Sequence, residues 1–290
     1  MAPSVREIPF TVENARGDAV DCDVRFVADD DGDKDDGDKP VVVFCHGFKG
    51  FKDWGPYPEW GRHLARAGFV SVHLNFSHNG VHRDAPTAFT ELDRFADNTF
   101  TRELDDLRAV LDVVETGRLL EAPADPHRIG LLGHSRGGGT VILQAGRDDR
   151  VAALVTWSSV ATFVDRFSDE QIEDWETKGY TEIRNSRTGQ TMRLNKRLYD
   201  DAMAHRDELD VQAAASRINV PWLVVHARDD EAVGVEAAET LAGANDSAQV
   251  FEAEGGHTFG GGHPFGGTVP ESLQAVWERT TAFFRAHLSG

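Results

Sequence analysis

The sequence IGLLGHSRGG, residues 129–138, decides the fold class. It begins with an apolar run typical of a buried strand and then matches the pattern Gly-x-Ser-x-Gly, with the serine at position 135. In this pattern a sharp turn between a strand and a helix exposes the serine side chain, and small residues flank it because the turn is crowded. We therefore predict that Ser135 is a nucleophile held between a strand and a helix that begins near residue 136.

A serine hydroxyl needs a histidine to take its proton and a carboxylate to orient that histidine. On such a strand–turn–helix unit, the acid and then the histidine follow the serine, each in a loop after a late strand. The segment WLVVHARDDEAV, residues 222–233, offers Asp229 and Asp230 for the acid, and His257 follows the next apolar run. We predict Asp230 as the acid and His257 as the base.

Three other residues compete for these roles. Asp229 stays open as the acid, because successive side chains of a strand point to opposite sides and a shift of one residue reverses which one faces the site. Either aspartate could instead cap the helix expected near residue 233. His263, in a glycine-rich segment, is the alternative base. His226 lies within an apolar strand, where a buried structural histidine is the better interpretation.

The stretch VVVFCHGFKGFKDW, residues 41–54, ends a buried strand with a histidine, a glycine and a phenylalanine. Attack by a serine turns a carbonyl oxygen into an oxyanion, which two backbone N–H groups must stabilise. One N–H belongs to the residue after the nucleophile, Arg136, and the other to a loop after an earlier strand. We predict Phe48 as the second donor, since Gly47 allows the backbone to approach the reacting centre. The Phe48 ring is a candidate wall of the acyl pocket.

Apolar strands alternate with helical segments over most of the chain. Strands this apolar are buried on both faces, as in a parallel sheet covered by helices. We expect such strands at 41–45, 69–74, 129–133, 151–157, 222–227 and 247–253, and helices near 57–67, 99–116, 136–147, 233–243 and 270–287. Two further strands, 5–13 and 20–28, predict an antiparallel edge, and the charged segment 29–39 predicts a solvated loop. The predicted fold class is α/β, with a mostly parallel twisted sheet and helices on both faces.

An insertion of about residues 158–215 interrupts this alternation between the sixth and seventh strands. It is too long for an ordinary connection, and GYTEIRNSRTGQTMRL within it predicts a hairpin that turns at 187–189. Ligands bind at the carboxyl ends of parallel strands, so we predict that the insertion is a lid over the site; a cap without substrate contact stays open. Its aromatic residues either bind a phenolic acid or, as we favour, pack the lid: Trp157, Phe163, Phe167, Trp175 and Tyr180. The whole chain, 1–290, is expected to be one domain.

The amino-acid composition limits the classes of molecule that the protein could bind. The formal charge is −19, from 30 lysines and arginines against 49 acids, so nucleic acid and anionic membrane surfaces are excluded as partners. Six lysines against twenty-four arginines, with thirty aspartates, favour a protein kept soluble in high salt. The N-terminus does not resemble a signal peptide and no apolar run reaches membrane-spanning length, so we predict a cytoplasmic protein. The oligomeric state is left open.

Three smaller groups of residues have weaker functional interpretations. Lys49 and Lys52 follow the predicted oxyanion loop and either attract an anionic substrate group or, as we favour, are simply solvated. His78, His82 and Asp84 lie in a predicted loop without a complete set of ligands, and we predict no metal. Two cysteines, Cys22 and Cys45, cannot form a disulfide framework and are expected to be buried.

Together these residues resemble the α/β-hydrolase superfamily over about residues 41–287, through HGF at 46–48, GHSRGG at 133–138, HARDD at 226–230 and GGHTF at 255–259. More narrowly, the chain is similar to the dienelactone-hydrolase-like and cinnamoyl (feruloyl) esterase group. This resemblance implies hydrolysis of a small-molecule carboxylic ester without a cofactor. Dienelactone hydrolases proper use a cysteine nucleophile, so Ser135 points toward an esterase. Ala227, where the family usually has glycine, and NFSHNG at 75–80 depart from the family pattern.

Two alternative functions stay open at this point. One is a peptidase related to the prolyl-oligopeptidase family, which shares the catalytic domain and the order of the motifs. The other is a receptor or scaffold that keeps the pocket without turnover.

Overall fold

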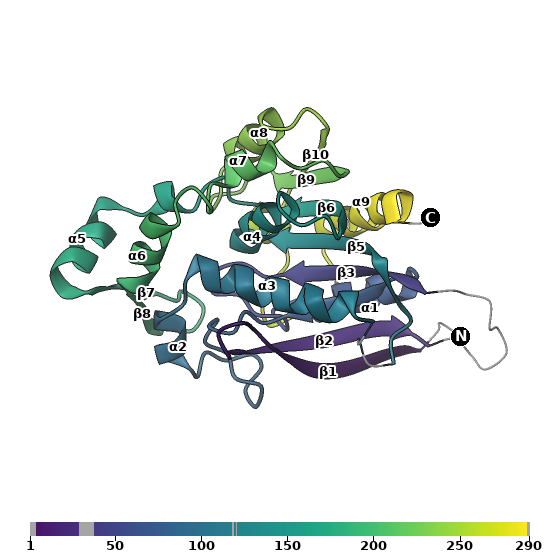
Figure 1. Ribbon diagram of the computed structural model, residues 1–290, viewed down its shortest axis with the longest axis horizontal. Helices are drawn as coiled ribbons and strands as arrows, with labels where there is room; N and C mark the ends of the chain where they lie inside the picture. Colours follow the sequence, from purple (N-terminus) through teal and green to yellow (C-terminus); the bar gives the residue numbers. More distant parts are fainter. Residues whose placement is uncertain (1–3, 29–37, 118, 120, 289–290) are drawn as a thin grey trace.

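The computed structural model describes residues 4–28, 38–117, 119 and 121–288, and a twisted sheet of eight strands forms its centre (Figure 1). The strands are β1 Val5–Glu13, β2 Ala19–Val27, β3 Lys39–Cys45, β4 Val70–Leu74, β5 Ala124–His134, β6 Val151–Trp157, β9 Trp222–Ala227 and β10 Ala248–Ala253. They lie in the order β1, β2, β4, β3, β5, β6, β9, β10. β2 is antiparallel to β1 and β4, and the other neighbours are parallel. The predicted α/β fold class is confirmed.

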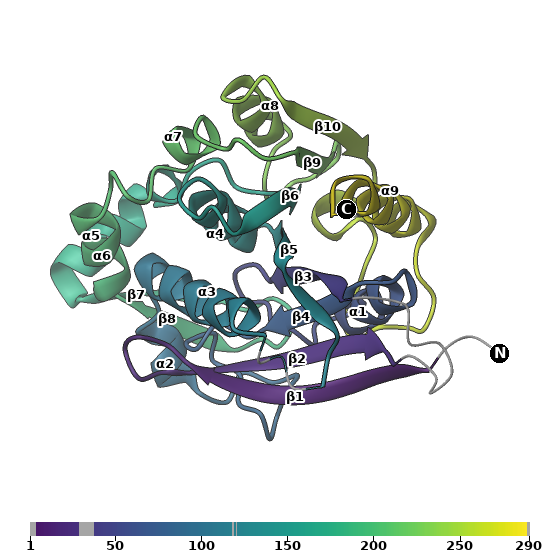
Figure 2. The same ribbon diagram turned by 45° about the vertical axis from the view of Figure 1, so that its right-hand side comes forward.

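Helices cover both faces of the sheet. They are α1 Tyr57–Arg66, α3 Phe100–Glu115, α4 Arg136–Ala145, α7 Val211–Ala215, α8 Glu236–Gly243 and α9 Glu271–Leu288, whereas the short helix α2 Leu92–Ala96 packs against strand β8 Thr191–Asn195 instead. Figure 2 shows α3 and α4 on one face and α1 and α9 on the other. Every residue of β3, β4 and β9 is buried, which explains why apolar residues predominate in these strands. None of the helices in the described ranges combines the length and the hydrophobicity needed to cross a membrane.

Several boundaries differ from the sequence prediction, most of all the starts of β5 and α8. β5 begins at Ala124, five residues before the predicted start, because a shift in register at Pro40 and Val41 lets the polar residues 124–128 join the strand. α8 begins at Glu236, since the preceding residues form a turn around Asp230. The short helix α2 was not predicted. Of the predicted loop 29–39, residues 29–37 lie outside the described residues, and Lys39 begins β3.

The insertion lies between β6 and β9, the sixth and seventh strands of the sheet in chain order. It contains the 3-10 turn η1 Val164–Arg166, the helices α5 Asp169–Lys178 and α6 Arg197–Ala204, and the strands β7 Tyr180–Arg184 and β8 Thr191–Asn195. β7 and β8 pair as the predicted hairpin, with Gly189 at φ 73° in its turn. The helices α5 and α6 were not predicted from the sequence. Figure 1 shows this part projecting beyond the sheet, next to α2.

Candidate active site

Ser135 lies at a strained turn between β5 and α4. Its φ of 57° and ψ of −119° are unfavourable for a residue with a side chain, so the surrounding structure has to hold it there. A Cβ atom on Gly133 would lie 2.2 Å from the carbonyl oxygen of Gly137, and one on Gly137 would lie 2.4 Å from the carbonyl oxygen of His46. The turn therefore requires both glycines of the motif.

The segments that carry the predicted site residues leave from one edge of the sheet. Cys45 at the end of β3 pairs with Gly133 near the end of β5, and Ala227 at the end of β9 pairs with Ala253 at the end of β10. Because these strands are parallel, their carboxyl ends meet at the same edge. The segments that follow them carry Phe48, Ser135, Asp230 and His257.

His257 and Asp230 are hydrogen-bonded to each other. Nδ1 of His257 donates to Oδ2 of Asp230 at 2.8 Å, and Oδ1 of Asp230 accepts the backbone N–H groups of Ala232 and Val233 at 2.9 Å each. Burial alone would raise the pKa of Asp230, but the bonds from His257 and from the two N–H groups lower it to about 2. The carboxylate is therefore ionised at neutral pH and can orient the imidazole and stabilise its protonated form.

Asp229 has a different partner. It is exposed, and its two oxygens accept the N–H groups of Gly256 at 3.0 Å and Gly255 at 3.3 Å. Asp229 therefore holds the backbone in front of His257, whereas Asp230 contacts the imidazole itself.

The other two histidines are engaged elsewhere. Nδ1 of His263 accepts the N–H of Gly55 at 2.9 Å, and the His263 ring stacks on Trp54. His226 is fully buried in β9, and its Nε2 donates to the carbonyl oxygen of Val233 at 2.8 Å. His226 is thus buried as the favoured interpretation expects, but it is only half satisfied: its Nδ1 has no hydrogen-bond partner among the described residues, and its Nε2 also lies 3.6 Å from Oδ2 of Asp230.

The loop after β3 packs directly against the turn at Ser135. A Cβ atom on Gly47 would lie 2.8 Å from Cβ of Ser135, so only glycine permits this approach. The N–H of Phe48 donates to none of the described residues. The N–H of Arg136, as the first residue of α4, has no carbonyl partner within its helix. Both N–H groups are therefore available to an oxyanion.

Ser135 faces a cavity of about 230 Å³. Its hydroxyl makes no hydrogen bond with a described residue, which leaves it available to a bound molecule. The wall is mostly apolar, with two guanidinium groups and one amide, and consists of Phe48, Phe100, Ser135, Arg136, Val160, Phe163, Arg166, Phe167, Gln171, Leu194 and Leu198. The seven residues from Val160 onward belong to the insertion, so the insertion forms part of the cavity wall.

The aromatic residues of the insertion divide between packing and the cavity. Trp175 is buried, and its indole N–H donates to the carbonyl oxygen of Leu194 at 2.8 Å. Trp157 lies in β6 and is equally buried. Phe163 and Phe167 line the cavity. Both also pack, since Phe163 is buried and the Phe167 ring centroid lies 5.0 Å from that of Trp175, so packing, the favoured interpretation, agrees with all four residues.

Sequence reasoning missed the residues that hold the Arg136 side chain. Its Nε donates to Oε2 of Glu103 at 3.1 Å, and Nη2 lies 2.9 Å from Oε1. The guanidinium also lies over the ring of Phe100, 4.4 Å from the ring centroid. Glu103 is buried on α3, 33 residues from Arg136. An acid on an amphipathic helix is usually solvated, so the sequence contains no signal for this pair.

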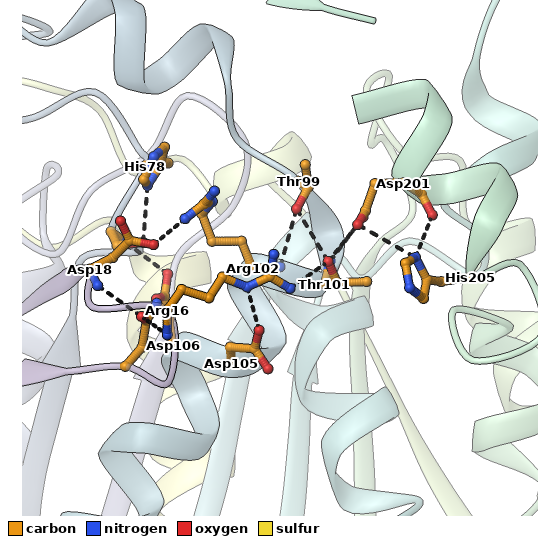
Figure 3. A network of polar contacts seen from close by, with 12 residues as sticks. Arg16, Asp18, His78, Thr99, Thr101, Arg102, Asp105, Asp106, Asp201 and His205 are labelled. Atoms are coloured by element: carbon orange, nitrogen blue, oxygen red, sulfur yellow. Dashed lines mark hydrogen bonds and ion pairs between the residues drawn. The ribbon is translucent and has the colours of Figure 1, made fainter. Parts of the chain in front are cut away.

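A polar network fastens the insertion to α3 (Figure 3). Asp201 of α6 accepts from Oγ1 of Thr101 at 2.5 Å and from its backbone N–H at 3.2 Å. This N–H lies in the first turn of α3, where a negative charge is stabilising. Arg16, in the turn between β1 and β2, donates to Oγ1 of Thr101 at 3.0 Å and to Asp105 at 2.6 Å. Thr101 thus connects α3 both to the insertion and to the turn between β1 and β2.

The two lysines after the predicted oxyanion loop differ in their partners. Lys52 forms ion pairs with Asp23 at 2.6 Å and with Asp53 at 2.7 Å, and these acids neutralise it. Lys49 instead lies with its Nζ 5.8 Å from the centroid of the Phe48 ring. Lys52 is therefore unsuited to attracting a substrate anion.

The histidines and cysteines outside the site form no larger cluster. His78 shares a hydrogen bond with a serine, and His82 lies 3.5 Å from Asp84. In the part of the chain that the structure describes, no group of three or more His, Cys, Asp or Glu side chains could hold a metal ion. Cys22 and Cys45 are unpaired, and burial raises the pKa of both thiols.

The chain is similar in sequence to one known protein family. Residues 40–199, just over half of the chain, match the family model described as alpha/beta hydrolase fold. The search of curated proteins finds no match.

Solved structures resemble the chain over nearly its whole length. Est1E from Butyrivibrio proteoclasticus with ferulic acid bound is 20% identical, with a TM-score of 0.69, over 97% of this chain and 100% of its own. The esterase domain of a Rhodothermus marinus protein is 18% identical, with a TM-score of 0.62, over 99% and 100%. Pyrococcus horikoshii acylaminoacyl peptidase is 18% identical, with a TM-score of 0.64, over 98% of this chain but 42% of its own. The match over residues 40–199 agrees with the strand order of the sheet and with the strained turn at Ser135. The chain belongs to the α/β-hydrolase fold family.

Proposed function

We propose that the chain is a serine hydrolase that cleaves carboxylic esters through an acyl-enzyme intermediate. Ser135 is the nucleophile, His257 the general base and Asp230 the acid that orients it. The observation that carries the proposal is the 2.8 Å hydrogen bond between His257 and Asp230 at the sheet edge where the strained Ser135 faces a cavity. The resemblance to Est1E and to the Rhodothermus esterase domain favours esters as the substrate class.

The first half of the reaction acylates the serine. His257 Nε2 takes the proton as Ser135 Oγ attacks the ester carbonyl carbon, and Asp230 stabilises the imidazolium that forms. The carbonyl oxygen becomes an anion that the N–H groups of Phe48 and Arg136 bind. When the tetrahedral intermediate collapses, the carbon–oxygen bond to the alcohol breaks, and His257 gives its proton to the leaving alcohol.

The second half releases the acid. Water attacks the acyl carbon while His257 again takes a proton, and the same two N–H groups bind the second oxyanion. Collapse returns the proton to Ser135 Oγ and frees the carboxylic acid. No cofactor takes part in this sequence.

The cavity suits an acyl group with apolar and aromatic character. Phe48, Phe100 and Phe163 offer ring surfaces next to Ser135, and the Phe100 and Phe163 rings stack with centroids 4.3 Å apart. Because the insertion supplies part of the wall, we propose that it acts as a lid that determines which acyl groups fit.

Replacing Ser135 with alanine tests the proposal. Ser135→Ala should abolish hydrolysis of short-chain p-nitrophenyl esters, because no other nucleophile faces the cavity in the described structure, while the circular dichroism spectrum and the thermal midpoint stay close to those of the wild type. A fluorophosphonate probe should label the wild type and not the variant. Retained turnover in the variant would refute the assignment, and failure of the probe to label the wild type would favour a receptor or scaffold.

The alternative of a peptidase has one observation in its favour, the resemblance to the acylaminoacyl peptidase. It covers less than half of that chain, and at 18% identity it reflects the fold alone. A matched ester and amide of the same acyl group would separate the two activities: we expect kcat/KM to be higher for the ester by a factor well above their difference in intrinsic reactivity.

A further inference from the structure

His134, the residue just before the proposed nucleophile, contacts the segment that carries the proposed base. Its ring is buried, and Nε2 lies 2.8 Å from the backbone carbonyl oxygen of His257. The rings of His134 and His257 are also neighbours, with centroids 4.7 Å apart. One side chain thus joins the turn of the nucleophile to the backbone of the base.

The hydrogen bonds of His134 determine its tautomer. A carbonyl oxygen can only accept, so Nε2 must carry the proton that it shares with His257. Nδ1 is then an acceptor, and the hydroxyl of Tyr57 lies 3.1 Å from it. Burial raises the pKa of Tyr57, so the hydroxyl keeps its proton and donates it to Nδ1. Burial and the charge of His257 lower the pKa of His134 to about 3, which keeps this imidazole neutral.

The carbonyl oxygen of His257 accepts a hydrogen bond from no other residue that the structure describes. The two preceding N–H groups, of Gly255 and Gly256, are bound by Asp229. The backbone on both sides is in the left-handed region, with φ of 65° at Gly256 and 55° at Phe259. Glycine adopts this conformation without strain, but Phe259 does not, because a side chain at positive φ is unfavourable, so contacts with the rest of the structure must hold this segment. His134 supplies the contact at the base itself.

We propose that Tyr57 and His134 are positioning residues, which hold the backbone of His257 at the working distance from Ser135 through one continuous chain of hydrogen bonds. Tyr57 fixes the tautomer of His134, and His134 fixes the carbonyl of His257. This inference rests on the proposed function, since it assigns His257 the role of the base. It assigns no bond-making step to either residue.

The test is a double-mutant cycle. Tyr57→Phe removes only the hydroxyl, and it should lower kcat for p-nitrophenyl butyrate by about 3- to 10-fold, the range for one hydrogen bond, with KM changed less than about 2-fold. His134→Gln keeps an N–H group near the position of Nε2 that does not depend on Tyr57. In the His134→Gln background, Tyr57→Phe should therefore change kcat by less than about 2-fold. Tyr180→Phe is the matched control, because its hydroxyl binds no described residue.

The proposal would be overturned if Tyr57→Phe had the same effect on kcat in both backgrounds, as expected for a role in packing alone, or if it had no effect in either. Hydrogen–deuterium exchange of the peptide 254–262 provides a readout that needs neither turnover nor a folded His134→Gln variant. Exchange in this peptide should be faster in Tyr57→Phe than in the wild type and in Tyr180→Phe; equal exchange would refute the proposal. An active Ser135→Ala variant would instead refute the proposed function, so the two failures are distinguishable.

Discussion

Replacing Glu103 with glutamine should destabilise the fold far more than the same replacement at a surface ion pair. Glu103 and Arg136 are 4% and 8% exposed, so the guanidinium would stay charged and buried without a counter-charge. Breaking a buried ion pair by removing one partner costs about 3–5 kcal/mol. For a chain of this size each kcal/mol shifts the thermal midpoint by about 2–4 °C, so we expect the midpoint to fall by about 6–20 °C.

Removal of both charges should recover most of this loss. Burial raises the pKa of Glu103 although Arg136 and three hydrogen bonds act in the opposite direction. The attraction within the pair therefore does not fully compensate for the desolvation of the carboxylate. We expect the double variant, Glu103→Gln with Arg136→Met, to unfold with a free energy within about 1–2 kcal/mol of the wild type.

Urea unfolding followed by circular dichroism at pH 7 measures these changes. The matched control is Glu121→Gln, because Glu121 pairs with Arg6 and their side chains are 66% and 46% exposed. Such a surface pair contributes at most about 1 kcal/mol. If Glu103→Gln were no more destabilising than Glu121→Gln, or if the double variant were less stable than Glu103→Gln alone, the account of a buried pair would be wrong.

Three further predictions concern the acids and the net charge. Asp230→Asn should lower kcat for p-nitrophenyl esters by about 10⁴-fold and Asp229→Asn by less than about 10-fold, and the opposite ranking would exchange their roles. Burial raises the pKa of Asp106 to about 7, so its contribution to stability is complete below about pH 4 and is lost as the pH rises through 7. Urea unfolding at pH 5, 7 and 9 should accordingly show wild-type stability falling relative to Asp106→Asn, and parallel curves would contradict this. Raising KCl from about 0.1 to 2 M should increase the thermal midpoint, because salt screens the repulsion within a chain of charge −19, and a decrease would count against adaptation to salt.

The parallel strands were predicted well because each is an apolar run bounded by polar turns. β6 and β9 begin and end at the predicted residues, 151–157 and 222–227. The start of β5 was missed because residues 124–128, ADPHR, have no strand pattern and join the sheet only through the irregularity at Pro40. The helices of the insertion were missed because α5 is strongly polar and α6 is only eight residues long, although Ser168 and Gln171 form a capping box that marks the start of α5.

The site was predictable where a motif fixes the geometry and not where packing does. The spacing of glycines around Ser135 specifies a turn, and the order of the later loops limits the acid and the base to a few residues. The choice between Asp229 and Asp230 depends on which side of one strand end faces His257, and that requires coordinates. Glu103 and Tyr57 lie on helices far along the chain, and no spacing rule connects either of them to Ser135.

Helix α3 joins two regions that a protein engineer would wish to exchange separately. In its first turn, Thr101 holds Asp201 of the insertion, and half a turn later Glu103 holds the arginine next to the proposed nucleophile. A graft that replaces residues 158–215 with the loop of a relative to alter substrate range would leave the start of α3 without its acidic partner. Designs of such chimeras should therefore retain an aspartate at the equivalent of Asp201, or the new loop would come with a less firmly held turn at Ser135.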